Sequence, residues 1–133
     1  PLRSLKSAYD LWNECKLFVD DYDSIREQGW RTYFEQFPDR FLCAYSDKDT
    51  LVATCVLFYD GRKAGVYRLA VSPAHQGKGL GRELIKFAES TAKKEGMSGI
   101  YALVDRSAKV SQSLFRKNGF TAIPEVEYFT KSI

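Results

Sequence analysis

The chain has 133 residues, of which 44% are apolar and 14% aromatic, which predicts one globular core and excludes a disordered chain. Its net charge is +3, but residues 1–61 hold 7 Lys and Arg against 11 Asp and Glu, whereas residues 62–133 hold 13 against 6. The basic second half indicates an anionic partner, with lysines on solvated helix faces as the alternative explanation.

Hydropathy and cysteine content exclude two further classes. No apolar run approaches the roughly 18 residues that a membrane helix needs, and no basic-then-apolar leader opens the chain. Cys15, Cys43 and Cys55 are widely spaced, and with one histidine and no CxxC pattern we expect free thiols and no metal site. We therefore expect a cytoplasmic protein without a membrane partner.

Two amphipathic helices are predicted at the start of the chain. Residues 7–19 place apolar side chains at helical spacing after Ser7, a candidate N-cap. Residues 24–37 repeat the pattern after an acidic stretch, and Pro38 ends it.

Strands follow. Residues 41–45 and 51–59 predict a hairpin, and residues 66–71 a third strand that ends before Pro73. A glycine-rich run then leads into a helix that extends to Gly96, a C-cap signal.

The last third predicts a strand over 99–104, a helix over 107–118 closed by Gly119, and short strands over 120–123 and 126–130. This order of elements predicts an α/β fold in which helices cover both faces of a mixed antiparallel and parallel sheet. Residues 1–133 are expected to form a single domain.

The glycine-rich run, residues 76–82, reads QGKGLGR. A helix start presents unpaired N–H groups, and glycine lets an anion approach them closely, so the run predicts a phosphate site. The alternative is a turn that merely connects strand to helix, but such a turn usually needs one glycine rather than three. The Walker A spacing is absent, and so is the GxGxxG dinucleotide spacing.

The QxxGxG pattern of residues 76–81, together with the strand that ends at Val71, closely resembles the acyl-CoA pyrophosphate loop of the GNAT superfamily of N-acetyltransferases. Residues 114–120, LFRKNGF, resemble that family's helix ending in aromatic-x-x-x-G-F. The resemblance is strongest over residues 66–120.

The resemblance implies acetyl-CoA as cosubstrate, held largely by backbone atoms. It implies that a strand pairs with the pantetheine arm, that a loop holds the pyrophosphate, and that two strands diverge to admit the thioester. The cofactor-binding residues so implied are Leu69, Ala70, Val71, Gln76, Gly77, Lys78, Gly79, Leu80, Gly81 and Arg82.

The implied reaction is direct attack of an amine on the acetyl thioester. A lysine-type amine, with a pKa of about 10.4, must lose a proton at a cost of roughly 4 kcal/mol at neutral pH, so a base matters for such an acceptor. The alternative function is a GNAT-fold module that binds acyl-CoA with little or no catalysis.

That alternative arises because three common family residues are replaced. Phe115 stands where many members have a tyrosine that serves the departing thiolate, Ala108 where an asparagine is frequent, and Leu103 where some relatives carry a glutamate base. Tyr101 and Tyr128 are therefore the candidate catalytic residues.

Two weaker catalytic candidates are Tyr67, which shares the period-2 face of Leu69 and Val71, and Asp105 at a strand end. The alternative for Asp105 is a cap on the following helix at Ser107, and a structural role is open for each tyrosine.

The acceptor is expected to be a small-molecule or peptide amine. In the family the first two helices wall the acceptor site, and their junction here carries Asp20, Asp21, Asp23 and Glu27. Those carboxylates would attract a cationic amine, with a solvated loop as the alternative. No nucleic-acid partner is expected, and the resemblance leaves a homodimer open.

Overall fold

The computed structural model describes residues 1–17, 27–131 and 133. Its helices are α1 (Leu5–Glu14), α2 (Glu27–Gln36), α3 (Leu80–Lys94) and α4 (Lys109–Lys117), with 3-10 turns η1 (Pro38–Arg40) and η2 (Pro73–His75). Its strands are β1 (Phe41–Tyr45), β2 (Leu51–Tyr59), β3 (Lys63–Val71) and β4 (Gly99–Ala102).

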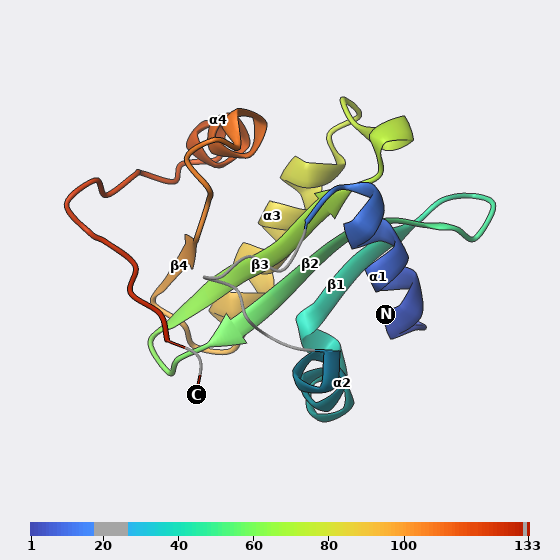
Figure 1. The fold of residues 1–133 in the computed structure, drawn as a ribbon, viewed down its shortest axis with the longest axis horizontal. Coiled ribbons are helices and arrows are strands. Elements are labelled where there is room, and N and C mark those ends of the chain that lie inside the picture. Colours follow the sequence, from blue (N-terminus) through green and yellow to red (C-terminus); the bar gives the residue numbers. More distant parts are fainter. Residues whose placement is uncertain (18–26, 132) are drawn as a thin grey trace.

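The four strands form one sheet in the order β1-β2-β3-β4. The first two pairings are antiparallel and the β3–β4 pairing is parallel, so the predicted mixed sheet is confirmed. Helices α1 and α2 lie on one face and α3 on the other, while α4 follows the end of β4 (Figure 1). The α/β class is confirmed as well.

Each face of the sheet has its own core. The α1–α2 core is largely aromatic: it contains Trp12, Trp30, Phe41 and Val56, and its indole and phenyl rings meet edge to face or tilted. The α3 core is mainly aliphatic, and its members include Cys55, Leu57, Ile85, Ala88 and Phe115. The sheet is thus covered on both sides, and its central strand β2 is almost wholly buried.

A β-bulge interrupts β3. Arg68 and Leu69 together oppose Cys55 of β2, since Tyr67 pairs with Val56 and Ala70 with Thr54. An extra residue moves every later side chain to the opposite face.

The expected face of Tyr67 is therefore wrong. Tyr67 packs against the α1–α2 core, whereas Leu69 and Val71 pack against the α3 core. The period-2 pattern that placed the three side chains together holds only for an unbroken strand.

A chain of buried hydrogen bonds holds the bulge. The Trp12 indole N–H donates to Thr54 Oγ1 over 2.9 Å, and the Thr54 hydroxyl donates to the Arg68 carbonyl over 2.9 Å. Arg68 itself adopts φ 50°, a conformation that side chains beyond glycine, asparagine and aspartate rarely take. The bulge is therefore tied directly to α1.

The first helix differs from the prediction at both ends. Its N-cap is Ser4, whose Oγ accepts from the Ser7 N–H, rather than Ser7 itself. It ends at Glu14, because Lys16 turns to φ 58° and the Leu17 N–H returns to the Trp12 carbonyl in a Schellman motif. The rest of the predicted helix, residues 18 and 19, lies outside the described residues.

The strands predicted over 120–123 and 126–130 are wrong: the structure gives residues 120–131 no strand. The β-rich composition of the segment led to the prediction, but strand structure requires a neighbouring strand to pair with, and Pro124 offers no N–H. In the part of the chain that the structure describes, no helix is long and apolar enough to cross a membrane.

We expect Thr54→Val to lower the free energy of unfolding by about 2–4 kcal/mol, because it buries the Trp12 indole N–H without its acceptor and removes a donor from the Arg68 carbonyl. Urea denaturation measures the change. Thr91→Val is the control, since Thr91 makes one exposed hydrogen bond within α3 and should change stability by at most about 0.5 kcal/mol. Equal stability of the two variants would contradict a supporting role for Thr54.

Candidate active site

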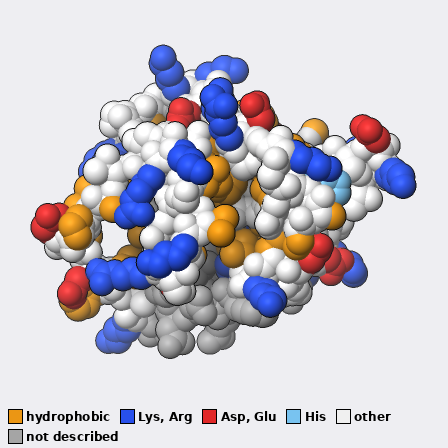
Figure 2. Space-filling view, turned by 90° about the horizontal axis from the view of Figure 1, so that it is seen from above, with side chains coloured by type: hydrophobic (Ala, Val, Ile, Leu, Met, Phe, Trp, Pro, Cys, Tyr) orange, Lys and Arg blue, Asp and Glu red, His pale blue; other side chains and the backbone are white. Residues whose placement is uncertain are grey.

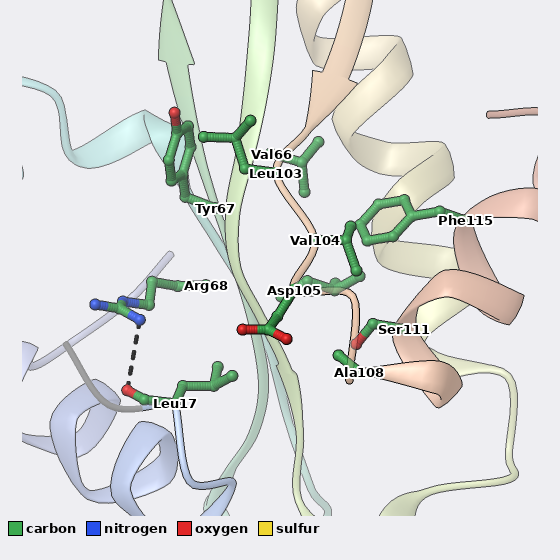
Figure 3. A pocket seen from close by; sticks show the side chains of 11 residues that line it. Leu17, Val66, Tyr67, Arg68, Leu103, Val104, Asp105, Ala108, Ser111 and Phe115 are labelled. Atoms are coloured by element: carbon green, nitrogen blue, oxygen red, sulfur yellow. Dashed lines mark hydrogen bonds between the residues drawn. The ribbon is translucent and has the colours of Figure 1, made fainter. Parts of the chain in front are cut away.

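A cavity opens where β3 and β4 part. Their pairing ends at Val66 and Ala102, but β3 continues through the bulge to Val71. The space between them encloses about 140 Å³, and Figure 3 shows side chains from β3, from the segment that follows β4 and from α4 facing it. The lining residues are Leu17, Val66, Tyr67, Arg68, Leu69, Leu103, Val104, Asp105, Ala108, Ser111 and Phe115.

The β3 side of the cavity has backbone N–H and C=O groups that no neighbouring strand pairs with among the described strands. Among the described strands, none pairs with β3 beyond Val66 on the side of β4. Because backbone N–H and C=O groups of a strand alternate between its two edges, the stretch from Leu69 to Val71 presents hydrogen-bonding groups toward the cavity edge. This edge could pair with an extended amide-containing ligand.

The opposite wall contains the three residues that depart from the pattern of the family that the sequence resembles. Leu103, Ala108 and Phe115 all line the cavity. They make this wall mainly apolar, and the hydroxyl of Ser111 is one of its polar groups (Figure 3). Ser111 was not among the predicted site residues, although its spacing of four residues from Phe115 places both on one helix face.

Phe115 also has a structural role. The Phe120 N–H returns to the Phe115 carbonyl and the Gly119 N–H to the Arg116 carbonyl, with Gly119 at φ 89°. This is a Schellman motif, in which the third-last helical residue usually contacts the residue after the glycine. Here the Phe115 and Phe120 rings meet with centroids 5.0 Å apart. The motif F-x-x-x-G-F is thus also a helix stop.

The glycine loop leads directly into α3. Gly77 and Gly79 adopt φ 78° and 85°, and Gly79 is the N-cap of α3 with no side chain capping that end. The first N–H groups of a helix have no partner within it, and the helix dipole makes this end positive. The start of α3 is therefore suited to an anion.

Gly81 serves a different purpose. It has ordinary helical φ, and a Cβ built on it would lie 2.9 Å from Leu114 Cδ2. Its small size lets the start of α3 pack against α4. Gln76 likewise supports the loop, because its side-chain amide donates to the Val71 carbonyl over 3.0 Å.

The surface around the loop is basic. Lys78 and Arg82 are both exposed, beside the uncapped start of α3. Figure 2, a view onto this end of the molecule, shows a hollow in which hydrophobic side chains are visible, with several Lys and Arg side chains around it. The charge here has the sign that a phosphate-bearing ligand requires.

The two candidate catalytic tyrosines lie in different parts of the chain's secondary structure. Tyr101 stands over Gly65 on the paired part of β4: a Cβ on Gly65 would lie 2.7 Å from the Tyr101 ring and hydroxyl. Tyr128 lies in the strandless C-terminal segment, with 54% of its surface exposed. The cavity lining includes Tyr67 and Asp105 but neither of these two.

Two charged groups face the cavity. Asp105 Oδ1 accepts from the Ser107 N–H over 2.8 Å and from the Ser107 hydroxyl over 2.6 Å, so the capping interaction with Ser107 exists. Arg68 was not a predicted site residue. Its guanidinium carbon lies 5.5 Å from the centre of the Trp12 ring and 5.4 Å from that of the Trp30 ring. The guanidinium also donates a hydrogen bond to the Leu17 carbonyl over 3.4 Å. Asp20, Asp21 and Asp23 lie outside the described residues.

The cysteines do not form a nucleophilic site. Burial raises the pKa of the Cys55 thiol to about 12, and burial is also the main cause that raises the pKa of Cys15 and of Cys43. A thiol with a raised pKa is a poor nucleophile at neutral pH. The described residues contain no cluster of His, Cys, Asp and Glu that could hold a metal.

Comparisons with known proteins agree with this geometry. The uncharacterized N-acetyltransferase YobR of Bacillus subtilis is 27% identical over 123 residues, which cover 91% of this chain and 49% of YobR. Spermidine N(1)-acetyltransferase of Thermoplasma acidophilum is 35% identical over 80 residues, which cover 60% of this chain and 49% of that protein. The chain thus spans about half the length of these relatives.

Solved structures share the fold. The aminoglycoside 6'-N-acetyltransferase AAC(6')-Ig of Acinetobacter haemolyticus, 25% identical, superposes with a TM-score of 0.71 over 100% of this chain and 95% of that one. The PaiA N-acetyltransferase of Thermoplasma acidophilum, crystallised with coenzyme A and 22% identical, gives a TM-score of 0.78 over 93% of this chain and 87% of that one.

The model of the acetyltransferase (GNAT) family matches residues 5–120, a range that includes the glycine loop, the diverging strands and the Gly119 helix stop. The chain belongs to the GNAT family of acetyltransferases.

Proposed function

We propose that the protein transfers an acetyl group from acetyl-CoA to an amine, by direct attack within a complex of protein and both substrates. The observation that carries this proposal is the uncapped start of α3, reached through Gly77 and Gly79 at positive φ, beside an open β3 edge and a cavity. Together these features provide an anion site, a backbone edge and a space for a reacting group.

The pyrophosphate of CoA suits the start of α3. Backbone N–H groups from Gly77 to Arg82 would hold its oxygens, because a residue without Cβ permits close approach and the helix end is positive. The exposed side chains of Lys78 and Arg82 would add positive charge near the pyrophosphate. Gln76 would act through the loop, since its side chain supports the Val71 carbonyl.

The pantetheine arm suits the open edge of β3. Its amide groups would pair with the backbone of Leu69, Ala70 and Val71, as an added strand pairs with a sheet edge. Its thioester end would then reach the cavity, whose apolar wall excludes water from the reacting carbonyl.

Tyr101 and Tyr128 stay the proposed catalytic side chains. Tyr101 is half-buried on the α1–α2 side of β4, close to Tyr67 across Gly65. A tyrosine hydroxyl in this position could exchange a proton with the acceptor, whose amine must be neutral to attack.

A second candidate function is binding of acyl-CoA without transfer. The specific observation that favours it is the placement of Leu103, Ala108 and Phe115 on one cavity wall. None of the three can accept or donate a proton with its side chain.

The acceptor is proposed to be an amine that carries positive charge, in a small molecule or a peptide, and no nucleic acid is expected to bind. The names of similar proteins supply suitable test compounds: spermidine, an aminoglycoside and a peptide with N-terminal alanine.

We expect Gly79→Ala to weaken CoA binding about tenfold or more, because an added Cβ at the helix start hinders the approach of the pyrophosphate and hydrogen bonds to charged groups contribute about 1.5–3 kcal/mol. Calorimetric titration with CoA measures the affinity.

Gly61→Ala is the matched control for Gly79→Ala. Both glycines have positive φ, 90° and 85°, and a Cβ on either meets nothing within 4 Å, so both variants should lose about 1–2 kcal/mol of stability. Gly61 lies in the β2–β3 turn and should leave CoA affinity unchanged. An equal loss of affinity in both would show that the glycines matter only for the backbone turn.

The acetyl transfer itself is tested by thiol release from acetyl-CoA in the presence of spermidine, an aminoglycoside or an alanyl peptide, with the acetylated product identified by mass spectrometry. We expect at least one acceptor to accelerate thiol release, and Gly79→Ala to raise the KM for acetyl-CoA. Tight CoA binding with no acetylated product from any acceptor would favour the binding module.

A further inference from the structure

Ser111 places a hydroxyl in the cavity, one turn of α4 before Phe115. Both side chains line the cavity, and Figure 3 shows the Ser111 oxygen directed into it from α4. Residues four apart lie on the same face of a helix. The hydroxyl is thus on the wall where the family's tyrosine hydroxyl is missing.

This hydroxyl is not committed to the fold. Serine in a helix can bond back to a backbone carbonyl one turn earlier, as Thr91 of α3 does with Phe87. Among the described residues, no hydrogen bond involves Ser111 Oγ. The donor therefore stays available to a ligand in the cavity.

The start of α4 favours negative charge at the same place. Ala108 is its N-cap and provides no side-chain cap, and both Ala108 and Ser111 border the cavity. The positive end of the helix dipole extends over the first turn. An anion that forms in the cavity near Ser111 would be stabilised by this helix end as well as by the hydroxyl. It would also share the cavity with the Asp105 carboxylate, which opposes it, and the Arg68 guanidinium, which favours it.

We propose, on the basis of the acetyl transfer proposed above, that the Ser111 hydroxyl donates a hydrogen bond to the CoA sulfur as the thioester breaks. In this step the acceptor nitrogen forms a bond to the acetyl carbon, the carbon–sulfur bond breaks, and its electron pair stays on sulfur. The proton that the nitrogen loses ends on the sulfur, while the Ser111 hydroxyl keeps its own proton and stabilises the charge that develops on the sulfur. The products are the acetylated amine and CoA with a free thiol, and Ser111 ends unchanged.

A binding measurement tests this contact without any acceptor. A hydrogen bond to a thiolate lowers the pKa of its thiol, so the thiol of bound CoA should ionise at lower pH in the unaltered protein than in Ser111→Ala. We expect the difference to be about one unit. Thiolate absorbance in the ultraviolet, titrated with pH, reports it, with the complex of CoA lacking its sulfur as the reference.

The chain provides a matched control variant, and its own cysteines add little to the thiolate absorbance. Ser113→Ala removes a hydroxyl from the exposed side of the same helix and should leave the bound thiol's pKa unchanged. The protein's own thiols interfere little, because burial raises the pKa of Cys55 to about 12 and raises those of Cys15 and Cys43. The same bound pKa in the Ser111→Ala and Ser113→Ala variants would overturn the proposal.

Turnover gives a second readout once an acceptor is found. Ser111→Ala should lower kcat about tenfold with little change in the KM for acetyl-CoA, since the hydrogen bond forms as the sulfur leaves. Adding Phe115→Tyr to Ser111→Ala should restore much of kcat, because it returns a hydroxyl to the same wall. A purely structural role for Ser111 predicts no such rescue.

The possible outcomes separate the two proposals. A shifted thiol pKa in a protein that acetylates none of the acceptors would support the contact of Ser111 with sulfur and favour the binding module over the acetyltransferase function. Acetylation with the bound pKa and kcat unchanged in Ser111→Ala would overturn the role of Ser111 alone. Failure to bind CoA at all would overturn both.

Discussion

The two hydrogen bonds of Thr54, one from the Trp12 indole and one to the Arg68 carbonyl, fix the bulge on which the rest of the site depends. A bulge bends its strand and increases its twist, and here it follows immediately after β3 stops pairing with β4 at Val66. The cavity and the open edge both begin at this point. Because Trp12 belongs to α1, the aromatic core on one face of the sheet controls the geometry of a cleft whose opposite wall comes from α4 and the segment that precedes it.

The glycine-rich loop combines two constraints that composition alone does not distinguish. Gly77 and Gly79 meet a conformational demand, positive φ, with open space around the missing Cβ. Gly81 meets a packing demand, since Leu114 of α4 occupies the space that its Cβ would take. The loop is therefore connected through Gly81 to the wall that carries Ser111 and Phe115, and a larger residue at position 81 would disturb both the proposed anion site and that wall.

Local signals in the sequence predicted most of the helices and strands. The predictions failed where contacts with distant parts of the chain determine the local structure. The hairpin, α3 and the Gly96 and Gly119 helix stops depend on patterns within a few residues. The face of Tyr67 could not be predicted, because the bulge is fixed by Trp12, far away in sequence. Two strands near Pro124 were predicted from composition, but a strand also needs a neighbour. Ser111 was missed because a serine near a helix start ordinarily suggests capping; its spacing from Phe115 was the available signal.

The division of the cleft between backbone and side chains explains why a family motif can be complete while the usual catalytic residues are absent. The start of α3 and the edge of β3 present mainly N–H and C=O groups, which every residue except proline supplies. Recognition of a phosphate-bearing, amide-containing ligand therefore depends on the path of the chain and tolerates side-chain replacement. The proposed chemistry depends instead on single side-chain atoms on β4 and α4. Phe115 lacks the hydroxyl that many family members have, and Ser111, one turn earlier, carries one. If both proposals hold, substitutions on that wall change the reaction, while those in the loop or the bulge change whether CoA is held at all.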